Sequence, residues 1–185
     1  ETEALFRDMV APLVEVSELD AKDVEVILIN DNQINAFVAG GQRMFFYSGL
    51  IATADTSDEV RGVMAHELGH ITGGHAIRFD EGLKPATGIT ILSLILGAAA
   101  IAAGAGEAGA GILAAGQQAA LGKFLSFSRE QERRADAAGA RYLSKAGLTG
   151  KGSIDFFKKL QNYEFRLGIP QEDSYGRTHP LSGER

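Results

Sequence analysis

The sequence His66-Glu67-Leu68-Gly69-His70 places two imidazoles four residues apart with a carboxylate beside the first. On an α-helix with 3.6 residues per turn, His66 and His70 lie on one face about one turn apart, so both rings can point at one metal ion. Glu67 lies about 100° round the helix, close enough to reach a water molecule held by that ion. The spacing therefore predicts a metal site with a general base next to it.

The residues around this motif predict the helix that the chemistry requires. Thr56 and Glu59 have the spacing of a capping box, and apolar residues then recur at helical intervals, at Val60, Val63, Met64, Leu68 and Ile71. The alternatives are a chance occurrence of the motif, or histidines that are merely packed in a core. The amphipathic context favours the metal site. Neutral imidazoles are suitable ligands for zinc, and the single motif leads us to expect one Zn²⁺ per chain.

The third ligand must be His, Asp or Glu, because the chain has no cysteine. The sequence Ser128-Arg129-Glu130-Gln131-Glu132-Arg133-Arg134-Ala135-Asp136 predicts the start of a second helix, with Ser128 as N-cap and Gln131 completing a capping box. Glu132 and Asp136 share a face of that helix, so Glu132 could bind the metal while Asp136 accepts a ring N–H from a ligand histidine. The alternative is an ordinary solvated, charged helix start.

Four separate patches of the chain resemble the family forty-eight zinc metallopeptidases. They are Asn35-Ala36-Phe37 with Gly40-Gly41 and Ser48-Gly49-Leu50; Asp58-Glu59 leading into His66–His70, with His75; Ser128-Arg129 with Glu132 and Ala135-Asp136; and Thr178-His179-Pro180-Leu181. This group includes the HtpX, CAAX prenyl, mitochondrial Oma-type and BepA-like proteases. The chain most resembles the soluble periplasmic BepA-like members.

The resemblance implies a role for each matching residue. His66, His70 and Glu132 would be the zinc ligands in a gluzincin arrangement, Glu67 the general base, and Asp136 the residue that orients a ligand. His179 would lie near the metal, either donating to the developing oxyanion or occupying the open coordination position in a self-inhibited state. His75 is expected to be structural or to support the ligands. Asn35, Ala36 and Phe37 would form the substrate-binding edge.

Composition bounds the class of protein and its partners. With 185 residues, 45% hydrophobic and 23% charged, the chain is expected to fold as a single metallopeptidase domain over residues 1–185. A net charge of −6 and the absence of a basic stripe argue against a nucleic-acid partner. The absence of cysteine excludes disulfides and thiolate metal sites.

The chemistry of the motifs and the strand pattern predict an α+β, mainly helical, zincin-like fold. Strands are expected at residues 24–30, 34–39 and 43–48, forming a small antiparallel sheet beside the metal helix, with a hairpin at Gly40-Gly41. An extended substrate could add to the sheet edge. A last helix is expected from about Ser153, with Ile154, Phe157, Leu160 and Leu167 toward the core and Phe156 beside them.

Residues 86–122 form an Ala- and Gly-rich helical hairpin insertion by their composition. No residue from Ala86 to Gly106 is charged, and by length this run could span a bilayer of about 30 Å. Thr87, Thr90, Ser93 and the short return segment weaken that interpretation. The preferred hypothesis is a mobile lid, and the alternative is a hairpin that contacts a membrane.

Together these observations predict a zinc endopeptidase with polypeptides as its partners, and the family resemblance implies misfolded or unassembled envelope proteins as its substrates. The alternative is a latent or chaperone-like zinc-binding protein whose site is closed by His179. The resemblance implies a location in the periplasm or cell envelope of a bacterium, with membrane association as a further expectation. The opening Glu1-Thr2-Glu3-Ala4 has no signal-peptide pattern and no initiator methionine, so we expect flanking sequence.

Overall fold

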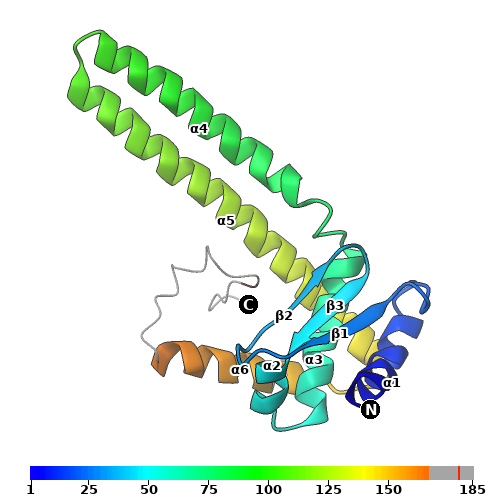
Figure 1. The fold of residues 1–185 in the computed structure, drawn as a ribbon. Helices are drawn as coiled ribbons and strands as arrows, with labels where there is room; N and C mark the ends of the chain where they lie inside the picture. Colours follow the sequence, from blue (N-terminus) through cyan, green and yellow to red (C-terminus); the bar gives the residue numbers. More distant parts are fainter. Residues whose placement is uncertain (167–178, 180–185) are drawn as a thin grey trace. The chain divides into compact units, whose positions relative to one another are not determined.

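A computed structural model of the protein describes residues 1–166 and His179. Its elements are α1 (Thr2–Glu15), β1 (Glu25–Ile29), β2 (Ala36–Ala39), β3 (Arg43–Tyr47), α2 (Ser48–Thr53), α3 (Ser57–Thr72), α4 (Phe79–Ala102), α5 (Gly106–Lys145) and α6 (Lys151–Arg166) (Figure 1). The chain divides into two compact units, one of residues 1–76 with 131–185 and the other of residues 77–130. The fold is mainly helical with one small sheet, as predicted.

The sheet is mixed, which corrects the expected antiparallel sheet. Its order is β1-β3-β2: β2 and β3 form the predicted antiparallel hairpin, and β1 pairs with β3 in parallel. Gly40 and Gly41 form the hairpin turn with φ values of 59° and 98°, which glycine adopts without steric cost. Because β1 and β3 run in the same direction, the chain must cross over between them, and β2 lies in that connection.

Alternation along the strands decides which face of the sheet is covered. Val26, Ala36, Met44 and Phe46 are buried, and the ring of Phe46 meets Phe6 of α1 edge-on at 5.4 Å. Phe37 and Phe45 lie on the other face, half-buried, with their rings stacked at 4.8 Å. One face of the sheet therefore belongs to the core of the first unit, together with α1 and α3.

Helix α3 begins where its capping box predicts, because the backbone N–H of Glu59 donates to the Thr56 hydroxyl at 3.3 Å. Glycines let other helices approach this one closely. A Cβ on Gly62 would meet the backbone of Ser153 in α6 at 2.7 Å, and one on Gly69 would meet Ala135 O in α5 at 2.5 Å. Helix α3 is thus enclosed by the sheet and by the helices α1, α5 and α6.

Helix α5 corrects the prediction of a helix start at Ser128, because it runs without a break from Gly106 to Lys145. Alanine, leucine and glutamine dominate residues 112–121 and favour helix, so no new N-terminus is needed at Ser128. The helix therefore already exists where the charged segment begins, and it carries Glu132 and Asp136 on a continuous backbone.

The last helix, α6, presents a different residue to the core from the one predicted. Phe156 is 3% exposed and belongs to the core, whereas Ile154 is 56% exposed. Leu160 packs against the core as expected, and Leu167 lies outside the described residues. The close contact of Gly152 with the backbone of Asp58, where a Cβ would approach within 2.1 Å, fixes the rotation of α6 and turns Phe156 inward.

In the second unit, α4 packs against the first part of α5 through small residues. A Cβ on Gly97 would meet Gly109 O at 3.0 Å, and a Cβ on Gly116 would meet Ser93 Cβ at 2.1 Å. A hairpin was predicted at residues 86–122, and helix α4 begins seven residues earlier, at Phe79. Among the helices of the described residues, α4 is the one long and apolar enough to cross a membrane.

Candidate metal centre

The metal-binding motif and the expected third ligand come together where α3 crosses α5. Gly69 lies against Ala135, and a Cβ on Gly139 would meet the Ala65 carbonyl group at 3.0 Å, so the two helix backbones are nearly in contact. This close approach brings Glu132 to within 3.4 Å of His66 Nε2 and 3.3 Å of His70 Nε2. Two glycines thus let residues 62 positions apart in sequence share one site.

Four side chains converge on one point, and their spacing fits a zinc ion. His66, His70, Glu132 and His179 each offer one atom within 4.8 Å of all the others. His66 Nε2 lies 3.0 Å from His70 Nε2 and 3.2 Å from His179 Nδ1, and His179 Nδ1 lies 3.2 Å from Glu132 Oε1. Tetrahedral Zn²⁺ with bonds of about 2.0–2.1 Å requires donors about 3.3 Å apart. The donor set therefore matches zinc in chemistry and in size.

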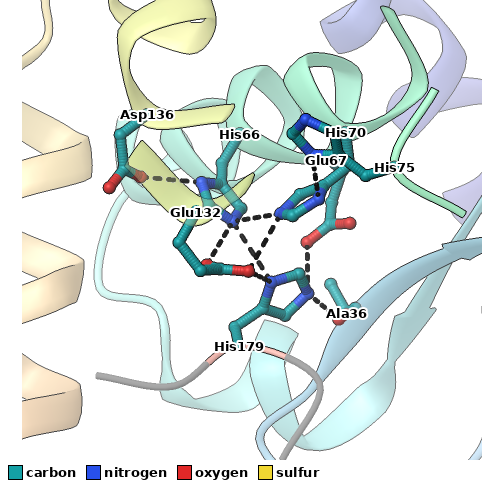
Figure 2. Close-up of polar contacts among 8 residues, drawn as sticks. All are labelled: Ala36, His66, Glu67, His70, His75, Glu132, Asp136 and His179. Carbon is teal, nitrogen blue, oxygen red and sulfur yellow. Dashed lines mark hydrogen bonds and ion pairs between the residues drawn. The ribbon is translucent and has the colours of Figure 1, made fainter. Parts of the chain in front are cut away.

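Asp136 contacts the ring of His66 on the side away from the donor set (Figure 2). Its Oδ1 lies 2.8 Å from His66 Nδ1, which directs His66 Nε2 toward the other donors. Burial by itself lowers the pKa of His66, but the hydrogen bonds to Asp136 and Glu132 outweigh it and raise the pKa above its usual value. A carboxylate in this position is a common way to fix the tautomer of a ligand histidine.

Glu67 is 1% exposed and presents its carboxylate beside the donor set. Oε1 lies 3.1 Å from His179 Nε2, whereas Oε2 is buried and has no hydrogen-bond partner among the described residues. Burial tends to raise the pKa of Glu67, but the interactions with His179, and then those with His66 and His70, lower it. A buried carboxylate oxygen with no partner is costly for folding alone, which points to a role in binding or chemistry.

His179 lies among these groups and contacts both sides of the site. Its Nδ1 belongs to the donor set, and its Nε2 lies 3.1 Å from the carbonyl oxygen of Ala36 as well as 3.1 Å from Glu67. Burial disfavours the charged ring, but Glu67 and Glu132 outweigh burial and raise the pKa of His179 well above its usual value. Its neighbours in the motif, Thr178, Pro180 and Leu181, lie outside the described residues.

The three residues predicted to bind substrate lie at the edge strand β2 or just before it, and each makes a different contact. The carbonyl of Asn35 accepts from Tyr47 N–H of β3 at 3.0 Å, so the carbonyl of Ala36 points the other way, toward His179. Phe37 stacks on Phe45, on the sheet face that carries these half-buried rings. Of the three, Ala36 is the one that contacts the centre through its backbone.

His75 returns to the site although it lies beyond the end of α3. Its Nδ1 is 2.9 Å from Nδ1 of His70, and the residue is 6% exposed. Burial, followed by the neighbouring His70, lowers the pKa of His75 to about 4. On a continuous helix, five residues of separation would place His75 on a different face from His70. A glycine at position 74, just after the end of the helix, is the sequence signal that the chain turns back toward the last turn.

A helix that carries two histidine donors and a glutamate, beside a small sheet, is characteristic of zincin-like domains. A model of peptidase family M48 matches residues 1–185, and the chain belongs to this family. A beta-barrel assembly-enhancing protease of Yersinia pestis is 33% identical over 162 residues, 85% of this chain and 32% of that protein. Metalloprotease LoiP of Escherichia coli (strain K12) is 32% identical over 155 residues, 82% of this chain and 56% of LoiP.

A mitochondrial relative matches almost the whole chain. Mitochondrial metalloendopeptidase OMA1 of Saccharomyces cerevisiae is 29% identical over 193 residues, which cover 99% of this chain and 50% of that protein. The chain therefore spans between 32% and 56% of the length of these three relatives.

Proposed function

We propose that the chain is a zinc endopeptidase domain in which residues 1–185 act as one catalytic unit, with the α4–α5 hairpin as an insertion. The observation that carries the proposal is Glu67: its Oε2 is buried without a partner in the described part of the chain, beside four converging metal donors. Relatives named as proteases and metalloendopeptidases support the same activity. A structural zinc site would not need a buried carboxylate of this kind next to the donors.

His66, His70 and Glu132 would hold the metal. Glu67 would transfer the proton, and Asp136 would orient a ligand. When bound, zinc supplies Lewis acidity, which polarises the scissile carbonyl and lowers the pKa of the attacking water. Glu67 accepts the proton of that water at Oε2 and then passes it to the leaving amine. Asp136 holds the ring of His66 by accepting its Nδ1–H.

The edge of β2 is suited to an extended polypeptide. The carbonyl of Ala36 points away from β3, toward the metal donors, so it can accept a hydrogen bond from the backbone of a substrate strand. Main-chain hydrogen bonding imposes little sequence specificity on the substrate, but it requires an unfolded segment. We therefore propose misfolded or unassembled envelope proteins as substrates, in agreement with a relative named as an enhancer of beta-barrel assembly.

The activity is tested by the substitution Glu67→Gln, with zinc content and cleavage of casein as measurements. One zinc per chain in both proteins, and a loss of cleavage of about 100- to 10,000-fold in the variant, is the expected result. Glu15→Gln, at an exposed position, serves as the matched control and should cleave as the wild type does. Equal cleavage by the Glu67→Gln protein would contradict the proposed mechanism, and a wild type without zinc would contradict the metal site.

A second function, a latent domain closed by His179, is favoured by the contacts of that ring. His179 Nδ1 takes the fourth position of the donor set, while Nε2 contacts both Glu67 and the Ala36 carbonyl. One side chain thus touches the open metal position, the general base and the substrate-binding edge. We propose that this is a resting state and that His179 must leave before a substrate strand can bind.

The substitution His179→Ala separates this role from an oxyanion donor. Release of a plug raises casein cleavage, whereas loss of a donor lowers kcat by about 100- to 1,000-fold. Unchanged cleavage would remove His179 from both roles. His179→Asn is a useful companion because it retains a hydrogen-bond donor but is a poor zinc ligand. A plug predicts raised cleavage in this variant, whereas an oxyanion donor predicts cleavage close to that of the wild type.

We further propose that the hairpin contacts a membrane, which the structure favours over a lid. Six large apolar residues in the second half of α4 are about half exposed: Ile91, Leu92, Leu94, Ile95, Leu96 and Ile101. At 100° per residue they cover an arc of roughly 220° round the helix, wider than the stripe that a single protein groove covers. Lipid, in contrast, can surround a helix on this whole arc.

The polar residues of α4 are also compatible with lipid. Thr90 and Ser93 donate their hydroxyls to the carbonyls of Ala86 and Thr90 at 3.1 and 2.8 Å, so these groups are satisfied inside the helix. The narrow face of small residues, Ser93 and Gly97, packs against α5, as in helix pairs of membrane proteins.

Membrane contact is tested with vesicles of phosphatidylethanolamine and phosphatidylglycerol, using Ile95→Lys and the deletion of residues 88–118. Loss of vesicle binding in both, compared with a Glu15→Lys control, is the expected result. A deletion protein that binds vesicles as the wild type does, but whose casein cleavage is altered, would support a lid instead.

A further inference from the structure

The end of helix α3 returns the chain to the metal donors. Gly73 has ordinary helical backbone angles (φ −72°, ψ −11°), and Gly74 follows in the left-handed region with φ 62°. The N–H of Gly74 donates to Ile71 O at 2.9 Å, and the N–H of His75 donates to His70 O at 3.1 Å. These two bonds define a Schellman motif, which brings the residue after the left-handed position against the residue in the last turn. In this chain those two residues are His75 and His70.

The contact between the two rings fixes where their protons lie. His70 presents Nε2 to His66 and Glu132, at 3.0 and 3.3 Å, and presents Nδ1 to His75. A neutral histidine that binds a metal through Nε2 carries its proton on Nδ1. That N–H can donate to Nδ1 of His75, 2.9 Å away, only if His75 offers a lone pair there and keeps its own proton on Nε2.

We propose that His75 is a positioning residue for the metal: it accepts the Nδ1–H of His70 and so fixes the ring of that ligand with a neutral partner. This inference rests on the proposed function, since it requires that the donor set holds zinc. The Schellman motif, the burial of His75 and the ring contact are the observations that carry it.

A neutral partner for His70 differs from the partner of His66 and has a physical reason. His66 is held by the carboxylate of Asp136, and Glu67 and Glu132 bring two further negative charges to the centre. A second carboxylate behind His70 would add negative charge at the metal and weaken it as a Lewis acid. An imidazole accepts the same hydrogen bond and orients the ligand without that charge.

Gly73 supports this arrangement from the other side of the ring. A Cβ there would lie 2.4 Å from His75 Nε2 and 2.7 Å from its Cδ2. Because the φ of −72° suits any residue, the backbone does not require glycine at this position. Glycine at position 73 leaves space for the ring of His75, which supplies a variant that displaces His75 without changing it.

The test compares His75→Leu, His75→Asn and Gly73→Ala in the whole chain, with zinc loss to a chelator and the Tm of the metal-free protein as measurements. Leucine removes the acceptor, whereas the amide oxygen of asparagine lies where Nδ1 lies and accepts the same bond. We expect zinc loss to be about 10- to 100-fold faster in His75→Leu and Gly73→Ala, and within about threefold of wild type in His75→Asn. Gly122→Ala, at a helical glycine with open space, is the control.

Two results would overturn the role of His75. One is zinc loss at the wild-type rate in Gly73→Ala and His75→Leu with an unchanged metal-free Tm. The other is zinc loss in His75→Asn as fast as in His75→Leu. The rate would then depend on the size of the side chain at position 75 and not on the hydrogen bond that it accepts. If His75→Leu does not fold, the Gly73→Ala and His75→Asn proteins decide. A wild type that binds no zinc is a different result, which contradicts the proposed function itself.

Discussion

Helices α3 and α4 show that the hydropathy of a helix does not decide whether it is buried. Helix α3 carries charges and two histidines, yet Met64 and Leu68 are 0% exposed and even Glu67 is 1% exposed. Helix α4 has no charged residue after Lys84, yet Leu94 and Ile95 are 54% and 61% exposed. Burial follows from glycines and apolar residues placed where other elements meet the helix. The comparison predicts that equal substitutions in the two helices have unequal effects.

The largest effect is expected for Gly69→Val, which adds a side chain where α3 and α5 cross in close contact. A Cβ at this position meets the backbone of Ala135 at 2.5–2.8 Å, and the backbone cannot yield as a flexible side chain does. We expect a loss of more than about 4 kcal/mol in free energy of unfolding, measured by urea denaturation, together with loss of zinc. Gly122→Ala in the second unit should be neutral or stabilising. Similar stability of the two variants would contradict the close crossing.

The next effect is expected for Leu68→Ala, which leaves a cavity between α3 and the core. Leu68 is fully buried, so the substitution should cost about 3 kcal/mol in free energy of unfolding. Urea denaturation with an unchanged m-value measures it. A cost below about 1 kcal/mol would mean that α3 is less enclosed than the structure describes.

A smaller effect is expected for Lys159→Met, because Lys159 joins α6 to the start of α3. Its Nζ donates to Thr53 O, Asp55 and the buried carboxylate of Glu59 at 2.9, 2.8 and 2.7 Å. Leaving Glu59 without this cation should cost about 2 kcal/mol at pH 8.

The pH dependence of this contact has a definite sign. Burial would lower the pKa of Lys159, but the hydrogen bonds to Asp55 and Glu59 raise it above its usual 10.5. The stabilisation is therefore complete below pH 10.5 and is lost as pH rises through the raised pKa of the folded state. Urea denaturation of wild type and Lys159→Met should converge at strongly alkaline pH. A difference that stays constant with pH would show that the charge of Lys159 is not involved.

The smallest effect is expected for Leu94→Ala in α4. Because Leu94 is 54% exposed, its removal should change the free energy of unfolding in buffer by less than about 0.5 kcal/mol. The same substitution should weaken vesicle binding if the hairpin contacts lipid. A cost in buffer as large as that of Leu68→Ala would mean that α4 is covered by protein.

The part of the site that comes from one helix could be predicted from the sequence. Helical periodicity alone places His66, Glu67 and His70, and the capping box at Thr56 marks the start of the helix that the structure confirms. The orientation of α6 was predicted wrongly, because the sequence pattern placed Ile154 toward the core. The contact of Gly152 with Asp58, a tertiary feature, turns Phe156 inward instead.

The sequence by itself determined which residues can bind a metal and activate water, because 3.6 residues per turn fixes the spacing of side chains along one helix. The tertiary structure alone decided which of those residues meet. Gly69 and Gly139 let α5 approach α3 so that Glu132 reaches both histidines, and the turn at Gly74 brings His75 back onto His70. Such contacts depend on how closely two backbones can approach, a property of the folded pair that neither segment carries alone.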